Sequence, residues 1–135
     1  HHKALADEMS EVAPVFDQAF TALITDLEQR GMLDSTLVVV ATEFGRKPDF
    51  SGDGRSHHPV CFSTVLAGGG TKAGFVYGKS DDAGYYPEDD AVSVGAFHAS
   101  IAYAAGMDIE KPATSPSGRP MTVGDGEPPI LELFT

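Results

Sequence analysis

The sequence has 135 residues, 41% of them hydrophobic, which suits one hydrophobic core and is too short for two ordinary domains. A formal net charge of -11 at pH 7 would repel nucleic-acid phosphates and an anionic membrane surface, so we expect neither as a partner. The single cysteine, Cys61, excludes an intramolecular disulfide and a cysteine-rich zinc module.

The first predicted element is one long amphipathic helix, from about residue 4 to residue 30. Its apolar residues recur in steps of three and four from Leu5 to Leu27, which places them on one helical face. Pro14 interrupts this pattern, so the helix is either kinked there or begins near Ser10, a suitable N-cap. Gly31 is a suitable residue to end it.

The run Thr36–Thr42 is uncharged and rich in β-branched residues, which predicts a strand buried on both faces in a parallel sheet covered by helices. Glu43, Gly45 and Arg46 follow it directly. Ligands of open α/β sheets bind just beyond the carboxyl ends of the strands. We therefore expect the chemistry at Glu43, Arg46 and the loop that follows.

The rest of the chain continues the α/β pattern. After a loop over residues 43–59 we expect strands at 60–66 and 74–78, a helix that begins at Ser93 and stops at Gly106, and a short terminal helix at 130–134. This order predicts an α/β fold, a three-layer α/β/α sandwich with a mainly parallel sheet.

The motif Gly54–Pro59 contains two adjacent histidines, His57 and His58. It lies at the far end of the loop that leaves Glu43. One carboxylate and one or two imidazoles suit a borderline divalent cation such as Zn²⁺. The alternative is that both histidines lie on a surface loop without a ligand.

Two arginines frame this loop, and each has two interpretations. Arg46 and Arg55 are suited to fork-shaped contacts with a phosphate or a sulfate group. The alternative is a structural ion pair with Asp49 or Asp53.

Several motifs together resemble a known family. The resemblance rests on six motifs that occur in the family's order: Asp26–Asp34, Thr36–Pro48, Gly54–Pro59, Leu66–Gly70, Val94–Ala99 and Ser117–Pro120. On these motifs the chain resembles a sulfatase-like domain of unknown function, number fifteen-oh-one, of the alkaline-phosphatase-like superfamily. The resemblance covers nearly the whole chain. It implies that residues 1–135 are the C-terminal part of one sulfatase-like α/β/α domain, and that the remainder of that domain lies upstream.

The resemblance also implies an activity and a set of site residues. The superfamily consists of metal-dependent hydrolases of phosphate and sulfate esters, so an anionic ester, either a small molecule or a polysaccharide, is the expected partner. The expected cofactor is a divalent metal, zinc first. His2 stands on a metal-ligand histidine of the family, and His57 aligns best with a later one, with His58 as the runner-up. The nucleophile is expected upstream, and a family export signal implies a periplasmic or extracellular location.

One departure from the superfamily pattern affects the expected site. Active sulfatases and phosphatases have Asp-His at the end of the central strand, where this chain has Glu43-Phe44. Phe44 cannot bind a metal, which favours a one-metal or altered site. The leading hypothesis is a hydrolase with a metal held by His2, Glu43 and His57 and an anion held by Arg46 and Arg55. The alternative is a non-catalytic binding or structural protein on the same fold.

Overall fold

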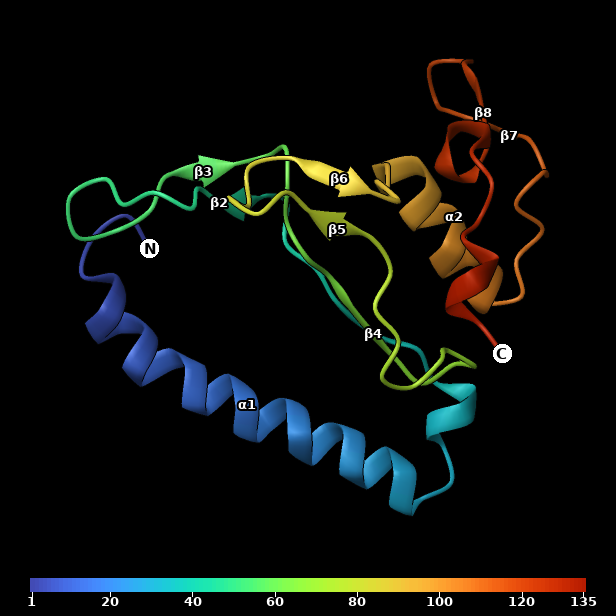
Figure 1. Cartoon of the computed structure of the whole chain (residues 1–135). Helices are drawn as coiled ribbons and strands as arrows, with labels where there is room; N and C mark the ends of the chain where they lie inside the picture. Colours follow the sequence, from blue (N-terminus) through green and yellow to red (C-terminus); the bar gives the residue numbers. More distant parts are fainter.

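The computed structural model describes all 135 residues and consists of two α-helices joined by short strands and 3₁₀ turns (Figure 1). The α-helices are α1 (Leu5–Gln29) and α2 (Val94–Ala104). The strands are β1 (Val38–Val40), β2 (Gly45–Arg46), β3 (His57–His58), β4 (Val65–Ala67), β5 (Lys79–Ser80), β6 (Pro87–Asp89), β7 (Ala113–Thr114) and β8 (Pro120–Met121). The 3₁₀ turns are Leu33–Ser35, Val123–Gly126 and Leu131–Leu133.

The long helix expected from the apolar spacing is confirmed as α1. Pro14 lies inside the helix and does not mark its start, so the alternative start at Ser10 is wrong. Pro14 is exposed, and water can therefore bond the carbonyl that loses its helical partner. Gly31 follows the helix with a φ of 65°, the left-handed conformation that ends helices most easily in glycine.

The apolar side of α1 is only partly covered. Ala13, Phe20 and Ile24 are half-buried and Leu27 is buried, so this line of residues faces the rest of the chain. A neighbouring apolar line is exposed and consists of Met9, Val12, Phe16 and Leu23. Neither helix is both long and apolar enough to cross a membrane.

The expected three-layer α/β/α sandwich with a parallel sheet is wrong. The strands form four separate two-stranded ladders, β1–β4, β2–β3, β5–β6 and β7–β8, and every ladder is antiparallel. The run that predicted a doubly buried strand forms only the three residues of β1, in which Val39 is 36% exposed. The local apolar pattern identified a strand correctly, but it specified neither the pairing direction nor a second covering layer.

The C-terminal part packs most tightly, around α2. Ser93 caps this helix by accepting a hydrogen bond from the Ala96 N–H at 2.9 Å. A Cβ added at Gly95 would lie 2.6 Å from the carbonyl oxygen of Gly124, so the Val123–Gly126 turn can approach the helix only because residue 95 is glycine. Ala99, Ser100, Ala102 and Ile130 are buried here and form the largest buried group of the chain.

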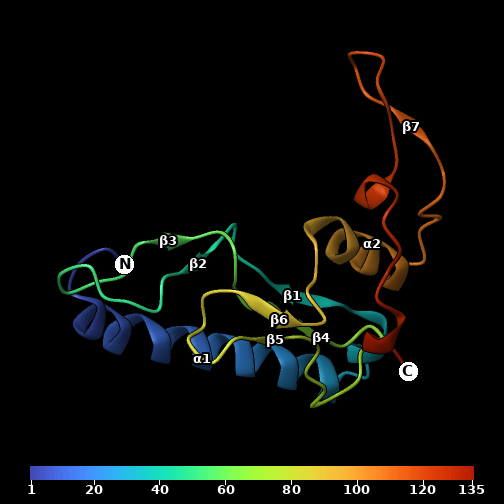
Figure 2. The ribbon, with the colours of Figure 1, turned by 45° about the horizontal axis from the view of Figure 1, so that its top comes forward.

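The two ends of the structure therefore differ in packing. Of 135 residues only seven are buried, and four of them belong to the α2 region. The N-terminus and the β2–β3 hairpin lie at the opposite end, where both views place them side by side (Figures 1 and 2). The remaining buried residues include His58 and Gly54 of this second end.

Candidate functional site

The β2–β3 ladder brings together two residues that the sequence placed at opposite ends of a loop. In this antiparallel pair Arg46 is the direct partner of His57, and Gly45 is the partner of His58. Side chains of directly opposed residues lie on the same face of a ladder and contact each other. The backbone register thus places a guanidinium beside an imidazole.

The N-terminal segment adds a second imidazole to this face. The loop between β2 and β3 holds the segment through two backbone hydrogen bonds, from the Arg55 N–H to the His1 carbonyl at 3.1 Å and from the Leu5 N–H to the Asp53 carbonyl at 3.0 Å. Between these bonds, His2 reaches His57 with its ring, and the two ring centroids are 4.7 Å apart.

The nitrogen atoms of the two imidazoles converge. His2 Nε2 and His57 Nε2 are 2.9 Å apart, and Arg46 Nη1 is 3.3 Å from the same His2 nitrogen. A guanidinium can only donate, so His2 Nε2 accepts from Arg46 and must carry a lone pair. The hydrogen bond between the imidazoles then runs from the His57 Nε2–H to His2, and the proton of the neutral His2 ring lies on Nδ1.

The electrostatics agree with this assignment. Desolvation lowers the pKa of His2 from its ordinary value of 6.5, and the positive charges of Arg46, His57 and the N-terminus lower it further. A neutral His2 is the form that accepts hydrogen bonds. We call His2, Arg46 and His57 the histidine–arginine cluster.

Phe44 supports the cluster, a role that the sequence analysis missed. Its ring stacks on His57 with centroids 3.9 Å apart and an interplanar angle of 28°. The guanidinium carbon of Arg46 lies 5.6 Å from the centre of the Phe44 ring, within the range of a cation–π contact. Phe44 immediately precedes β2, in a stretch where the sequence predicted a loop, so no sequence signal placed its ring beside Arg46.

Glu43 lies apart from the two converging nitrogens. It lines a hollow of about 360 Å³ that it shares with Arg46, Cys61 and other residues of the β2 region. Glu43 is exposed and makes no hydrogen bond to either histidine. No group of three or more His, Cys, Asp or Glu side chains in the structure is arranged to hold a metal ion.

His58 has a different environment from its neighbour. Its side chain is buried, and His58 Nε2 lies 2.7 Å from the carbonyl oxygen of Tyr85, to which it donates. The Tyr85 ring also packs edge-on against the imidazole, with centroids 5.7 Å apart. His58 therefore connects β3 to the turn before β6, and this nitrogen is already occupied.

Arg55 takes part in the site through its backbone. Its carbonyl accepts a hydrogen bond from Arg46 Nη1 at 3.2 Å, which helps to orient that guanidinium. The side chain of Arg55 lies over the Phe50 ring, with its guanidinium carbon 5.0 Å from the ring centre. Its Nε atom is buried without a hydrogen-bond partner. The alternative interpretation, an ion pair of Arg46 or Arg55 with Asp49 or Asp53, is not found among the salt bridges of the structure.

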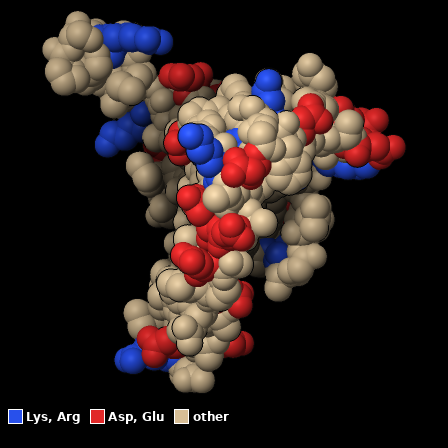
Figure 3. All heavy atoms as spheres, turned by 90° about the vertical axis from the view of Figure 1, so that its left-hand side faces the viewer, with Lys and Arg blue, Asp and Glu red and all other residues tan.

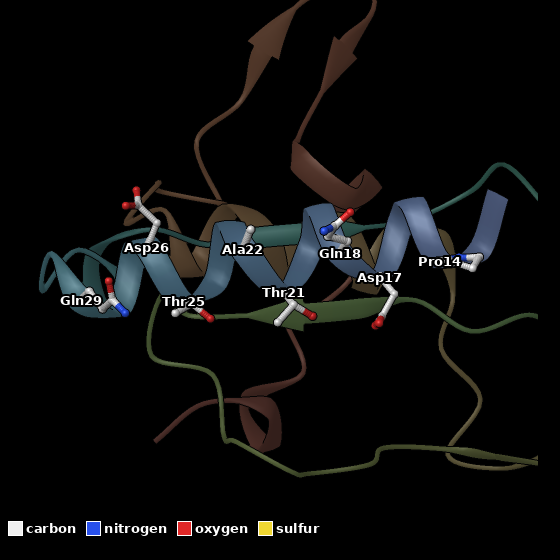
Figure 4. Close-up of a pocket in the computed structure, with 8 residues that line it drawn as sticks. All are labelled: Pro14, Asp17, Gln18, Thr21, Ala22, Thr25, Asp26 and Gln29. Atoms are coloured by element: carbon white, nitrogen blue, oxygen red, sulfur yellow. The ribbon is translucent and has the colours of Figure 1, made fainter. Parts of the chain in front are cut away.

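Two further surface features differ from the cluster in composition. A hollow along the polar side of α1 is lined only by residues of that helix, such as Gln18, Thr21 and Thr25, and contains no predicted site residue (Figure 4). Acidic side chains are spread over the side of the molecule shown in Figure 3, in keeping with 20 Asp and Glu against 9 Lys and Arg in the sequence. The cluster thus concentrates nitrogen groups in a protein that is otherwise acidic.

Comparison with known proteins gave one match. No curated protein and no solved structure matches the sequence. The model of one family matches residues 1–134, which is nearly the whole chain. The chain therefore belongs to the family described as "Protein of unknown function (DUF1501)".

Proposed function

We propose that this chain contributes the anion-binding part of the active site of a hydrolase that acts on phosphate or sulfate esters. The observation that carries the proposal is the convergence of Arg46 Nη1 and His57 Nε2 on His2 Nε2 within 3.3 Å and 2.9 Å. Arginine is the side chain best suited to a tetrahedral oxyanion, because its donors are planar, permanently charged and spaced like the oxygens.

Each member of the cluster has a distinct role in this proposal, and that of His2 is to orient Arg46 by accepting from its Nη1 at 3.3 Å. Arg46 would neutralise the ester anion and donate to its oxygens, and the Arg55 carbonyl at 3.2 Å keeps the guanidinium in place. His57 would turn its Nε2–H from His2 to an ester oxygen. Phe44, stacked at 3.9 Å on His57, excludes water from one face of that ring and holds its plane.

A divalent metal fits only part of this arrangement. Two nitrogens on one tetrahedral zinc lie about 3.3 Å apart, so His2 and His57 could share an ion if the 2.9 Å contact opened slightly and His57 released the proton on its Nε2. A catalytic zinc site needs three protein ligands, however, and Glu43 and His58 do not join the pair. A bound metal would supply Lewis-acid activation of an oxygen.

Catalysis would also need a nucleophile and a further metal ligand. The nucleophile and the missing metal ligand would come from the remainder of the same domain upstream, as in the sulfatase and alkaline-phosphatase superfamily. Export to the periplasm or the cell exterior would give access to ester substrates, including sulfated or phosphorylated polysaccharides. The exposed apolar line on α1 offers a surface that further polypeptide would cover.

A second candidate function is anion binding without catalysis. It is favoured by the position of Phe44, whose ring lies against His57 where a metal-ligand side chain would be needed for an active site. On this candidate the cluster would still bind phosphate or sulfate, but no bond would be cleaved.

The test compares Arg46→Gln with Arg119→Gln in the full-length protein. Arg119 is an exposed residue next to β8, at the end of the molecule opposite the cluster. Binding of inorganic phosphate and sulfate is measured by calorimetry, and hydrolysis is measured with 4-nitrophenyl phosphate and 4-nitrophenyl sulfate. We expect Arg46→Gln alone to weaken anion binding about tenfold or more. Equal affinity in both variants would contradict the anion site, and binding without hydrolysis in the wild type would favour the second candidate.

A further inference from the structure

We infer that Gly54 is a positioning residue that sets where His2 meets His57, and that no larger residue at position 54 allows the cluster to form. The inference rests on the proposed function, because it concerns the same anion site. Gly54 is buried, although residues 51–53 before it are exposed and residues 55 and 56 after it are only half-buried. Its role would be steric, and it would act through His2.

Gly54 lies directly against the backbone of the N-terminal segment. A Cβ added at Gly54 would lie 2.3 Å from the carbonyl carbon of His2, 2.4 Å from its oxygen and 2.6 Å from the Lys3 nitrogen. All three are backbone atoms, so no side-chain rotation relieves the overlap. The segment would have to move away from the loop.

The loop is closed on itself and is bound to the N-terminal segment on both sides of Gly54. The Ser51 N–H donates to the Gly54 carbonyl at 2.8 Å, which closes a tight turn around Gly52. On either side of Gly54, the Asp53 carbonyl and the Arg55 N–H hold Leu5 and His1 through the two bonds described above. A Cβ at position 54 therefore fits only if the loop and the segment separate, which strains the two flanking bonds.

The contact with Gly54 lies at the backbone of His2, which is a member of the cluster. The two backbone bonds and the Gly54 contact surround His2, and the ring of His2 has to reach His57 from that backbone position. A shift of the segment by the length of a methyl group would exceed the range over which a 2.9 Å hydrogen bond survives. The sequence motif that contains His57 thus also contains the residue that admits His2.

Gly52 provides the matched control. It lies in the same turn, has a φ of 71°, and an added Cβ would meet no atom within 4 Å. Gly52→Ala therefore strains the turn without touching His2, whereas Gly54→Ala touches His2. If Gly54→Ala and Gly52→Ala differ in sulfate affinity, the difference is due to the contact of position 54 with the His2 backbone and not to the loss of a glycine from the loop.

The experiment measures two properties of the full-length wild type, Gly54→Ala and Gly52→Ala. The first is the nuclear Overhauser cross-peak between the ring protons of His2 and His57, and the second is the affinity for inorganic sulfate. We expect Gly54→Ala to lose the cross-peak and to weaken sulfate binding about tenfold, and Gly52→Ala to keep both. Retention of the cross-peak in Gly54→Ala would overturn the inference. Loss of the cross-peak with unchanged sulfate affinity would support the inference and contradict the proposed anion site.

A second variant and a measurement on the wild type complete the test. In a His2→Ala background, Gly54→Ala should weaken sulfate binding no further, because its effect passes through His2. An equal loss in both backgrounds would overturn the inference. In the wild type the amide protons of Leu5 and Arg55 should exchange slowly with solvent, and rapid exchange of both would overturn it even where Gly54→Ala does not fold.

Discussion

The hydroxyl of Ser100 connects α2 to the C-terminal segment by accepting a hydrogen bond from the Ile130 N–H at 2.9 Å. The same hydroxyl donates to the Ala96 carbonyl at 2.7 Å, and Ser100 has 0% exposure. We predict that Ser100→Ala lowers the free energy of unfolding by about 1–3 kcal/mol, because the buried Ile130 N–H loses its partner. Chemical denaturation measures this change. Ser10→Ala, which removes an exposed hydroxyl, is the control and should change stability by less than half as much.

Ser93 gives a prediction that separates capping from charge. Its hydroxyl accepts from the Ala96 N–H and donates to the carboxylate of Glu127. Ser93→Ala should cost about 1 kcal/mol of unfolding free energy. Ser93→Asn should cost less, since its amide can both accept and donate. Ser93→Asp should be less stable than Ser93→Asn, because a second carboxylate would face Glu127, although Asp and Asn are equally good caps. Equal stability of these two variants would contradict the Glu127 contact.

The helices were predictable from the sequence because helix formation is read from local spacing. The three-and-four steps from Leu5 to Leu27 identified α1, and Ser93 and Gly106 bracketed α2. The terminal helix expected at residues 130–134 is a 3₁₀ turn at Leu131–Leu133, and the strand expected at 74–78 is absent. The sheet was not predictable, because β1 pairs with β4 through residues that are distant in sequence.

The sequence predicted which residues belong to the candidate site, but it did not predict which of them lie close together. The motif and the resemblance selected His2, Arg46 and His57, which the structure brings together. Glu43 and Arg46 follow the same strand, yet only Arg46 reaches the histidines. The β2–β3 register decides which side chains share a face, and no local pattern specifies that register. The burial of His58 depends on Tyr85, which is 27 residues away and outside any motif.

The two adjacent histidines should respond differently to substitution. His58→Ala should lower the free energy of unfolding by about 1–3 kcal/mol, because it leaves the Tyr85 carbonyl without its donor and opens a buried space. His57→Ala should cost less stability, because its ring is exposed on one side, but should abolish the contact with His2. Thermal unfolding and zinc titration with the full-length protein measure the two effects. If zinc uptake depended on His58 and not on His57, then His58 would be the site residue and His57 the structural one, contrary to our assignment.

The pKa of His2 should depend on Arg46. Desolvation is the larger cause of the lowered pKa, and the charge of Arg46 comes next. We therefore predict that Arg46→Gln raises the pKa of His2 toward 6.5 without restoring that value, because desolvation and the charges of His57 and the N-terminus remain. Proton nuclear magnetic resonance of the His2 ring as a function of pH measures the shift. Arg119→Gln is the control and should leave the titration unchanged.

The same lowered pKa predicts the direction of the pH dependence of stability. The unfolded chain protonates His2 at its ordinary pKa of 6.5, whereas the folded chain protonates it only at lower pH. Between these two values the unfolded state binds more protons, so the contribution of His2 to stability is complete above pH 6.5 and is lost as the pH falls to the folded-state pKa. His2→Gln removes this loss. The difference in the free energy of unfolding between pH 7.5 and pH 5 should thus be smaller in His2→Gln than in the wild type. A larger difference in the variant would show that folding raises the pKa of His2. That result would contradict the hydrogen bond from Arg46 to His2.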